Sequence, residues 1–188
     1  MKEQLTNTAL LVMDMQEQML KGLPEAGPLI EKTAKAISNA RNKGVPVIYV
    51  VVGFRKGVPE ISYRNKTFSA RAATLKQQDM EQWMKIAPQL APAENEAVVV
   101  KRRYSAFTGS DLEVLLRGMN IYHLVLAGVV TSGVVLSTLR EAADKDFQLT
   151  VLSDACLDRD PQVHTFLVEK IFPQQAEVTT VEAWTNGK

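Results

Sequence analysis

Two side chains of opposite charge follow apolar runs of the sequence, and together they could carry acid–base chemistry. Asp14 comes directly after the run 8–13, and Lys101 comes directly after the run 97–100. Continuously apolar runs of this length predict strands buried on both faces of a parallel sheet. Ligands of such sheets bind outside the carboxyl ends of the strands, so we expect both side chains at one crevice. The alternative is that Asp14 only caps a helix and Lys101 only marks where a strand emerges into solvent.

A turn with two glycines follows a third apolar run, at residues 122–127. It contains Val130, Thr131, Ser132 and Gly133, and a helical pattern begins there. Such a turn offers unpaired backbone N–H groups and the positive end of a helix dipole, which suit an anion or a developing oxyanion. The sequence therefore predicts an acid/base group, a cation and an anion hole in one place.

Short apolar runs alternate with longer amphipathic stretches along the chain, which predicts the elements that position these residues. This alternation indicates right-handed βαβ units and a parallel sheet with helices on both faces. We expect the α/β class, with a three-layer α/β/α arrangement around a Rossmann-like open sheet of about six strands. The predicted strands are 8–13, 45–52, 97–100, 122–127, 148–152 and, more weakly, 177–180. The predicted helices are 28–43, 79–86, 110–117, 132–146 and 161–171.

Bulk properties exclude several classes of function. The 188 residues fit one domain, 1–188, and the net charge of +1 gives no reason to expect a nucleic acid or an anionic membrane as partner. The apolar run 9–13 is too short for a signal peptide or a membrane span. The single cysteine, Cys156, cannot form an internal disulfide or a multi-cysteine zinc site, so we expect a cytoplasmic protein. No His and carboxylate spacing predicts a metal site, and we expect no cofactor.

The segment 53–78 fits neither a strand nor a helix pattern. It contains six basic residues and one acid, Glu60. Long loops in compact domains are usually lids, binding loops or interface arms, although a solvated basic loop is an equal alternative. Arg55 and Arg64 in this segment favour an acidic substrate.

Four segments of the chain, in order, resemble those of the isochorismatase-like family of cysteine hydrolases. Residues 8–16 resemble the opening strand, which ends in the family's catalytic aspartate and is often followed by glutamine. Residues 101–112 resemble the lysine segment, with its Ser-Ala-Phe sequence ending at Phe107. Residues 126–144 resemble the nucleophile segment, and residues 151–156 the closing strand.

This resemblance implies roles for particular residues and exposes one departure. Asp14 and Lys101 are implied to be catalytic, Phe107 is implied to lie at the substrate pocket, and a non-proline cis peptide is implied before the turn, at Val129–Val130. Where cysteine hydrolases have their nucleophile, this chain has Val134. A cysteine there would form a thiolate stabilised by the helix dipole and the nearby lysine, which valine cannot do.

Other nucleophiles are poor replacements for that thiol. Cys156 lies in the closing-strand segment, where a lone cysteine is usually a small buried apolar residue. Ser132 and Thr131 are nearer the expected place, but both are typical helix N-caps, and a serine nucleophile needs a base. The family's nicotinamidases use histidines after the second strand, and this chain has none there, which disfavours that activity.

We therefore expect a hydrolase of a small anionic molecule that acts without a cysteine. The family's true isochorismatases cleave a vinyl ether with the aspartate as acid/base group, although glycine usually replaces the cysteine in them. The alternative is a pseudoenzyme that binds a ligand or serves as an assembly subunit. By resemblance we also expect a homo-oligomer, a dimer or a tetramer.

Overall fold

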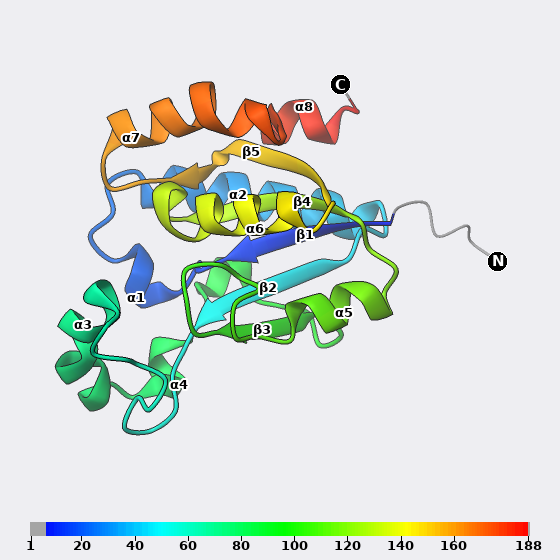
Figure 1. Ribbon diagram of the computed structural model, residues 1–188. Coiled ribbons are helices and arrows are strands. Elements are labelled where there is room, and N and C mark those ends of the chain that lie inside the picture. Colours follow the sequence, from blue (N-terminus) through cyan, green and yellow to red (C-terminus); the bar gives the residue numbers. More distant parts are fainter. Residues whose placement is uncertain (1–6, 188) are drawn as a thin grey trace.

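The computed structural model describes residues 7–187, and within them the chain forms a six-stranded parallel sheet (Figure 1). The strand order is β3-β2-β1-β4-β5-β6. All five strand pairings are parallel, which confirms the predicted sheet. The strands are β1 (Thr8–Met13), β2 (Val47–Val52), β3 (Ala97–Lys101), β4 (His123–Val129), β5 (Gln148–Leu157) and β6 (Glu177–Thr179).

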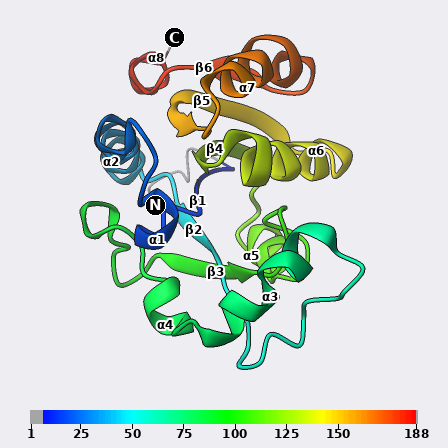
Figure 2. The same cartoon turned by 90° about the vertical axis from the view of Figure 1, so that its left-hand side faces the viewer.

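Helices cover both faces of this sheet and complete the predicted three-layer arrangement. Figure 2 shows α2 and α8 on one side of the sheet and α5, α6 and α7 on the other. The α-helices are α1 (Glu17–Leu20), α2 (Ala26–Asn42), α3 (Lys66–Gln77), α4 (Met80–Trp83), α5 (Leu112–Gly118), α6 (Leu136–Asp144), α7 (Pro161–Phe166) and α8 (Val181–Thr185). Shorter 3-10 and π-helical turns are η1 (Pro88–Leu90), η2 (Thr131–Val135), η3 (Leu167–Ile171) and η4 (Phe172–Gln174).

Strand β1 shows why the apolar runs form strands in the middle of three layers. Leu11 and Met13 pack into the core under α5 and α6, whereas Leu10 and Val12 pack into the core under α2. Successive side chains of a strand point to opposite faces, so a strand covered on both faces must be apolar at every position.

The strand order reverses direction at β1, which lies between β2 and β4. Crevices that bind ligands form at such switch points, beyond the carboxyl ends of the strands. Residue 128 in β4 must be glycine because a Cβ there would clash with the carbonyl oxygen of Met13 in β1. Close contact of the two backbones thus sets the base of the crevice.

The segment 53–78 contains a helix that the sequence analysis missed. Helix α3 begins after Asn65, whose side chain accepts a hydrogen bond from the Phe68 N–H. Phe68, Ala72 and Leu75 follow at helical spacing and pack with Phe54 in a small separate cluster. A second difference is that the helix predicted at 132–146 divides into η2 and α6. Within residues 7–187, none of the helices has the length and apolarity required to cross a membrane.

Candidate functional site

The structure brings Asp14 and Lys101 together at the switch point, as their positions after two strands predicted. The Lys101 Nζ lies 2.9 Å from the Asp14 Oδ2, and the residues are 3% and 4% exposed. The Asp14 N–H donates to the Val50 carbonyl in β2, and its backbone takes a φ of +56°, a left-handed conformation that aspartate accepts more readily than most residues. Asp14 therefore turns out of β1 with its carboxylate directed to the end of β3.

The two oxygens of the Asp14 carboxylate have different environments. Oδ2 accepts from Lys101, whereas Oδ1 is buried and has no hydrogen-bond partner among the described residues. Burial raises the pKa of the Asp14 carboxyl, and the charge and hydrogen bond of Lys101 offset this only in part. Lys101 is held in place by a second hydrogen bond, 2.9 Å to the Arg103 carbonyl. A buried carboxylate with one unsatisfied oxygen is the arrangement expected of a group that meets a substrate.

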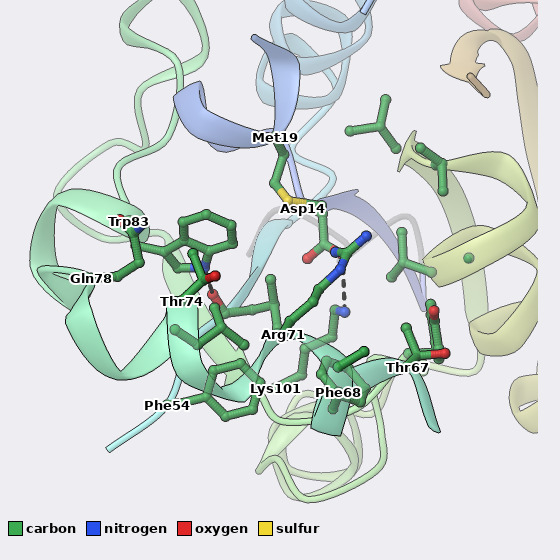
Figure 3. A pocket seen from close by; sticks show the side chains of 18 residues that line it. Asp14, Met19, Phe54, Thr67, Phe68, Arg71, Thr74, Gln78, Trp83 and Lys101 are labelled. Atoms are coloured by element: carbon green, nitrogen blue, oxygen red, sulfur yellow. Dashed lines mark hydrogen bonds and ion pairs between the residues drawn. The ribbon is translucent and has the colours of Figure 1, made fainter. Parts of the chain in front are cut away.

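The Asp14–Lys101 pair lies in the wall of a cavity of about 300 Å³ (Figure 3). Apolar and aromatic side chains form most of its lining, and Arg71 is the third charged residue in it. The lining residues are Asp14, Met19, Val52, Phe54, Thr67, Phe68, Ala70, Arg71, Thr74, Leu75, Gln78, Trp83, Lys101, Tyr104, Val129, Val130, Gly133 and Val134. A mostly apolar concave site with a few convergent polar groups is typical of small-molecule binding.

Gln16 holds the aromatic wall of this cavity to the sheet. Its buried side chain accepts a 2.7 Å hydrogen bond from the Val52 N–H and donates a 2.7 Å bond to the Trp83 carbonyl. The Trp83 indole N–H in turn donates to the Val52 carbonyl, at 3.0 Å. The sequence analysis gave Gln16 no role of its own, although the glutamine after the aspartate was part of the resemblance.

The turn after β4 supplies another wall, and the Val129–Val130 peptide is cis, as the resemblance implied. Val130, Gly133 and Val134 line the cavity, with Val134 only 2% exposed. The side chain at the position of the family's nucleophile thus faces the same space as Asp14 and Lys101.

The other residues expected in an anion hole are directed elsewhere. The Ser132 N–H donates to the Asp158 Oδ2 at 2.7 Å, and the Gly133 N–H donates to the Val130 carbonyl at 3.0 Å. The Thr131 hydroxyl is buried against His164 Nδ1, at 2.8 Å. Neither Thr131 nor Ser132 lines the cavity, which corrects their expected place and removes the geometric basis for Ser132 as a nucleophile.

Three other expected pocket residues also lie outside the cavity. Phe107 is buried in the core, with its ring 5.8 Å from that of Phe147. Arg55 pairs with Glu60 at 2.8 Å, with 70% of its side chain exposed. Arg64 lies over the ring of Tyr63. Arg55 and Arg64 are displaced because the acid in their segment and a neighbouring ring bind them locally, and the helix α3 that follows brings Arg71 to the cavity instead.

Cys156 is buried in the core, where it was expected, and it offers no thiolate. Its Sγ lies 3.9 Å from the Leu126 carbonyl oxygen, and burial raises the pKa of the thiol to about 12. His123 makes hydrogen bonds with Thr8 and Thr150 beside its strand. Among residues 7–187 there is no group of three or more His, Cys, Asp or Glu side chains that could hold a metal ion.

Comparison with known proteins shows the family of this chain. The model of the isochorismatase domain matches residues 8–183. The chain belongs to the isochorismatase family. It is 31% identical over 183 residues to the uncharacterized isochorismatase family protein YecD of Escherichia coli O157:H7, covering 96% of this chain and 95% of the relative.

An enzyme and a solved structure are similarly close. The chain is 31% identical over 199 residues to the ureidoacrylate amidohydrolase RutB of Serratia proteamaculans, covering 94% of this chain and 77% of that enzyme. An isochorismatase family protein from Burkholderia thailandensis superimposes with a TM-score of 0.84 and 30% identity, over 94% of this chain and 92% of that one. The solved structure thus shares the fold of this chain over nearly its whole length.

Proposed function

We propose that this chain hydrolyses a small molecule by acid–base catalysis at Asp14, without a protein nucleophile. The observation that supports this is the unsatisfied Oδ1 of a buried carboxyl whose pKa is raised. A carboxyl with a raised pKa keeps its proton closer to neutral pH, so it can donate that proton to a substrate.

Lys101 acts by holding Asp14 and by balancing its charge. When Asp14 gives up its proton, the ammonium 2.9 Å away stabilises the carboxylate that forms. The hydrogen bond from Lys101 to the Arg103 carbonyl fixes the direction of the ammonium, which keeps Oδ2 occupied and leaves Oδ1 for the substrate.

Val134 and Cys156 together exclude a thiol route. Val134 lines the cavity but has no nucleophilic atom, and the Cys156 thiol is buried in the core with a raised pKa. A vinyl ether avoids the need for a nucleophile on the protein. Asp14 protonates the terminal vinyl carbon, which gives an oxocarbenium ion. Water adds to the cationic carbon and returns one proton to Asp14, and the resulting hemiketal breaks its C–O bond to give a ketone and an alcohol.

The test is pyruvate release from isochorismate, which carries such a vinyl ether. We expect Asp14→Asn to lower kcat by about 10²–10⁴-fold, the usual contribution of a general acid. Asp111→Asn is the matched control, because Asp111 is exposed, precedes α5 and makes no side-chain capping bond. Equal turnover by wild type and Asp14→Asn would refute the role of Asp14.

The second candidate function is that of a binding protein without turnover, and it is favoured by Val134 at the position of the nucleophile. In that case a ligand raises the temperature of thermal unfolding, and its concentration does not fall on prolonged incubation with the protein. Homo-oligomer formation stays a prediction, which sedimentation of the purified chain would test.

A further inference from the structure

Arg71 is a cation of the cavity with no partner of its own. Among the described residues it makes no ion pair and no side-chain hydrogen bond, in contrast to Arg55 and Arg102, which both pair with Glu60. Figure 3 shows its side chain extending from α3 toward the side of the cavity where Asp14 and Lys101 lie. An arginine that lines a cavity without an acid beside it is available to an anion from outside.

Polar side chains on one face of α3 and at its C-cap, Gln78, accompany Arg71. Thr67, Arg71, Thr74 and Gln78 recur at intervals of three or four residues, all are exposed, and all line the cavity. The adjacent face of α3 carries the apolar side chains that attach the helix to the protein, and two of these, Phe68 and Leu75, also line the cavity. The helix therefore presents a row of hydrogen-bonding groups centred on one guanidinium to whatever occupies the cavity.

The charges of the cavity favour an anionic occupant. The lining holds two cations, Lys101 and Arg71, and one acid, Asp14, so its net charge is positive whether Asp14 is protonated or ionised. An anionic group on the occupant would offset that charge. Lys101 is already bonded to Asp14 and to the Arg103 carbonyl, so Arg71 is the cation left to bind that group.

The rest of the cavity is apolar. Phe54, Phe68, Trp83 and Tyr104 contribute rings, and Val52, Val130 and Val134 contribute aliphatic surface. A flat apolar body would bury its surface there and gain from contact with the rings. An acetate-sized ion would leave most of the roughly 300 Å³ unfilled.

From these observations we propose that the cavity binds a small carboxylate with a flat apolar body, and that Arg71 is the residue that selects the carboxylate. The carboxylate lies against Arg71 and the polar row of α3, and the apolar body lies between the rings and the turn after β4. The reacting bond then faces Asp14. This inference rests on the proposed function for the identity of the site, and it concerns binding rather than turnover.

Three probe ligands separate recognition of the carboxylate from recognition of the apolar body. Phenylacetate has both the anion and the apolar body, phenylacetamide replaces the anion by a neutral group of the same shape, and acetate has the anion alone. Measured by titration calorimetry at constant ionic strength, phenylacetate should bind about tenfold or more tightly than either of the others, because a charge-assisted pair replaces a neutral one.

Two variants assign the preference to Arg71. In Arg71→Gln the affinity for phenylacetate should fall about tenfold or more, to that of phenylacetamide, while the affinity for phenylacetamide stays within about twofold. The matched control is Arg64→Gln, since Arg64 belongs to the same basic segment, is exposed and does not line the cavity. It should keep the wild-type preference.

Three outcomes would overturn the proposal that Arg71 selects a carboxylate. Equal affinity of the wild type for phenylacetate and phenylacetamide would exclude recognition of a carboxylate, and loss of the preference in Arg64→Gln would exclude Arg71 as its specific cause. No binding of phenylacetate at millimolar concentration would exclude this class of ligand. Selective binding of phenylacetate by a protein that hydrolyses nothing would instead refute the proposed function and leave this inference standing.

Discussion

Two ion pairs lie at the two ends of strand β3, and their carboxylates differ in how many hydrogen bonds they accept. At its amino end, Glu96 binds Arg41 through both oxygens, at 2.9 and 2.7 Å, and accepts a third bond from the Ala93 N–H. At its carboxyl end, Lys101 binds one oxygen of Asp14, and the other oxygen has no partner among the described residues.

Their pKa shifts have opposite directions because a different effect dominates in each pair. The bonds from Arg41 lower the pKa of the Glu96 carboxyl, because each of them favours the ionised form. Burial raises the pKa of the Asp14 carboxyl, because a single bond from Lys101 does not replace the lost water. The Arg41–Glu96 pair, which is fully hydrogen-bonded and partly exposed, attaches α2 to the loop before β3. The buried Asp14–Lys101 pair leaves one carboxylate oxygen without a partner, and we expect it to lower the free energy of unfolding.

The largest difference should appear when each pair loses its cation. Lys101→Met leaves Asp14 buried without a counter-charge, so we expect the free energy of unfolding to fall by about 3–5 kcal/mol. Urea unfolding at pH 7 measures this. The double variant Asp14→Asn/Lys101→Met should recover part of the loss, because no buried charge remains. A loss below about 1 kcal/mol would mean that the pair behaves like one on the surface.

A smaller loss is expected at the other end of β3. Arg41→Met removes the bonds to Glu96, but Arg41 is exposed and Glu96 remains within reach of water, so we expect a loss of about 1 kcal/mol. Phenylacetate affinity should not change, because Arg41 lies outside the cavity around Asp14. The same urea unfolding and calorimetry measure both. If Arg41→Met lowered the free energy of unfolding as much as Lys101→Met does, the two ion pairs would not differ in their contribution to stability.

The smallest expected effect is on the pH dependence of stability, to which Asp14 and Glu96 should contribute with opposite signs. Folded Asp14 binds its proton more tightly than unfolded aspartate, so its contribution to the free energy of unfolding is complete at low pH and is lost as the pH rises through the raised pKa. Folded Glu96 binds its proton less tightly, so its contribution is present above the ordinary glutamate pKa and is lost as the pH falls through the lowered one.

Urea unfolding at several pH values between about 3 and 8 tests this sign. As the pH rises, the stability of the wild type should fall relative to Asp14→Asn and rise relative to Glu96→Gln. Parallel changes for the two variants would show that Asp14 is not destabilised by its burial.

Features that depend on the ends of apolar runs could be predicted from the sequence. Six strands, their parallel arrangement and the meeting of Asp14 with Lys101 follow from where those runs stop. Side-chain directions in the segment 53–78 could not be predicted, because they depend on which cation Glu60 binds. One signal for α3 was present: the N-cap Asn65 is followed by Phe68, Ala72 and Leu75 at helical spacing.

The turn after β4 shows a similar limit. Its place beside Asp14 follows from topology, and the cis peptide was implied by the resemblance. That Ser132 would bond to Asp158 and point away from the cavity depends on a contact 26 residues further along the chain. No local pattern contains that information.

The separation of α3 from the sheet has a consequence for how this protein could change in evolution. Asp14 and Lys101 lie at strand ends that the core holds in place. Thr67, Arg71 and Thr74 of α3, and its C-cap Gln78, are instead exposed in the β2–β3 connection. Exposed positions usually tolerate substitution within about 0.5 kcal/mol. If Arg71 selects the substrate as proposed, substitutions at these four positions should change substrate preference at little cost in stability, and directed evolution for a new substrate should begin with those four codons.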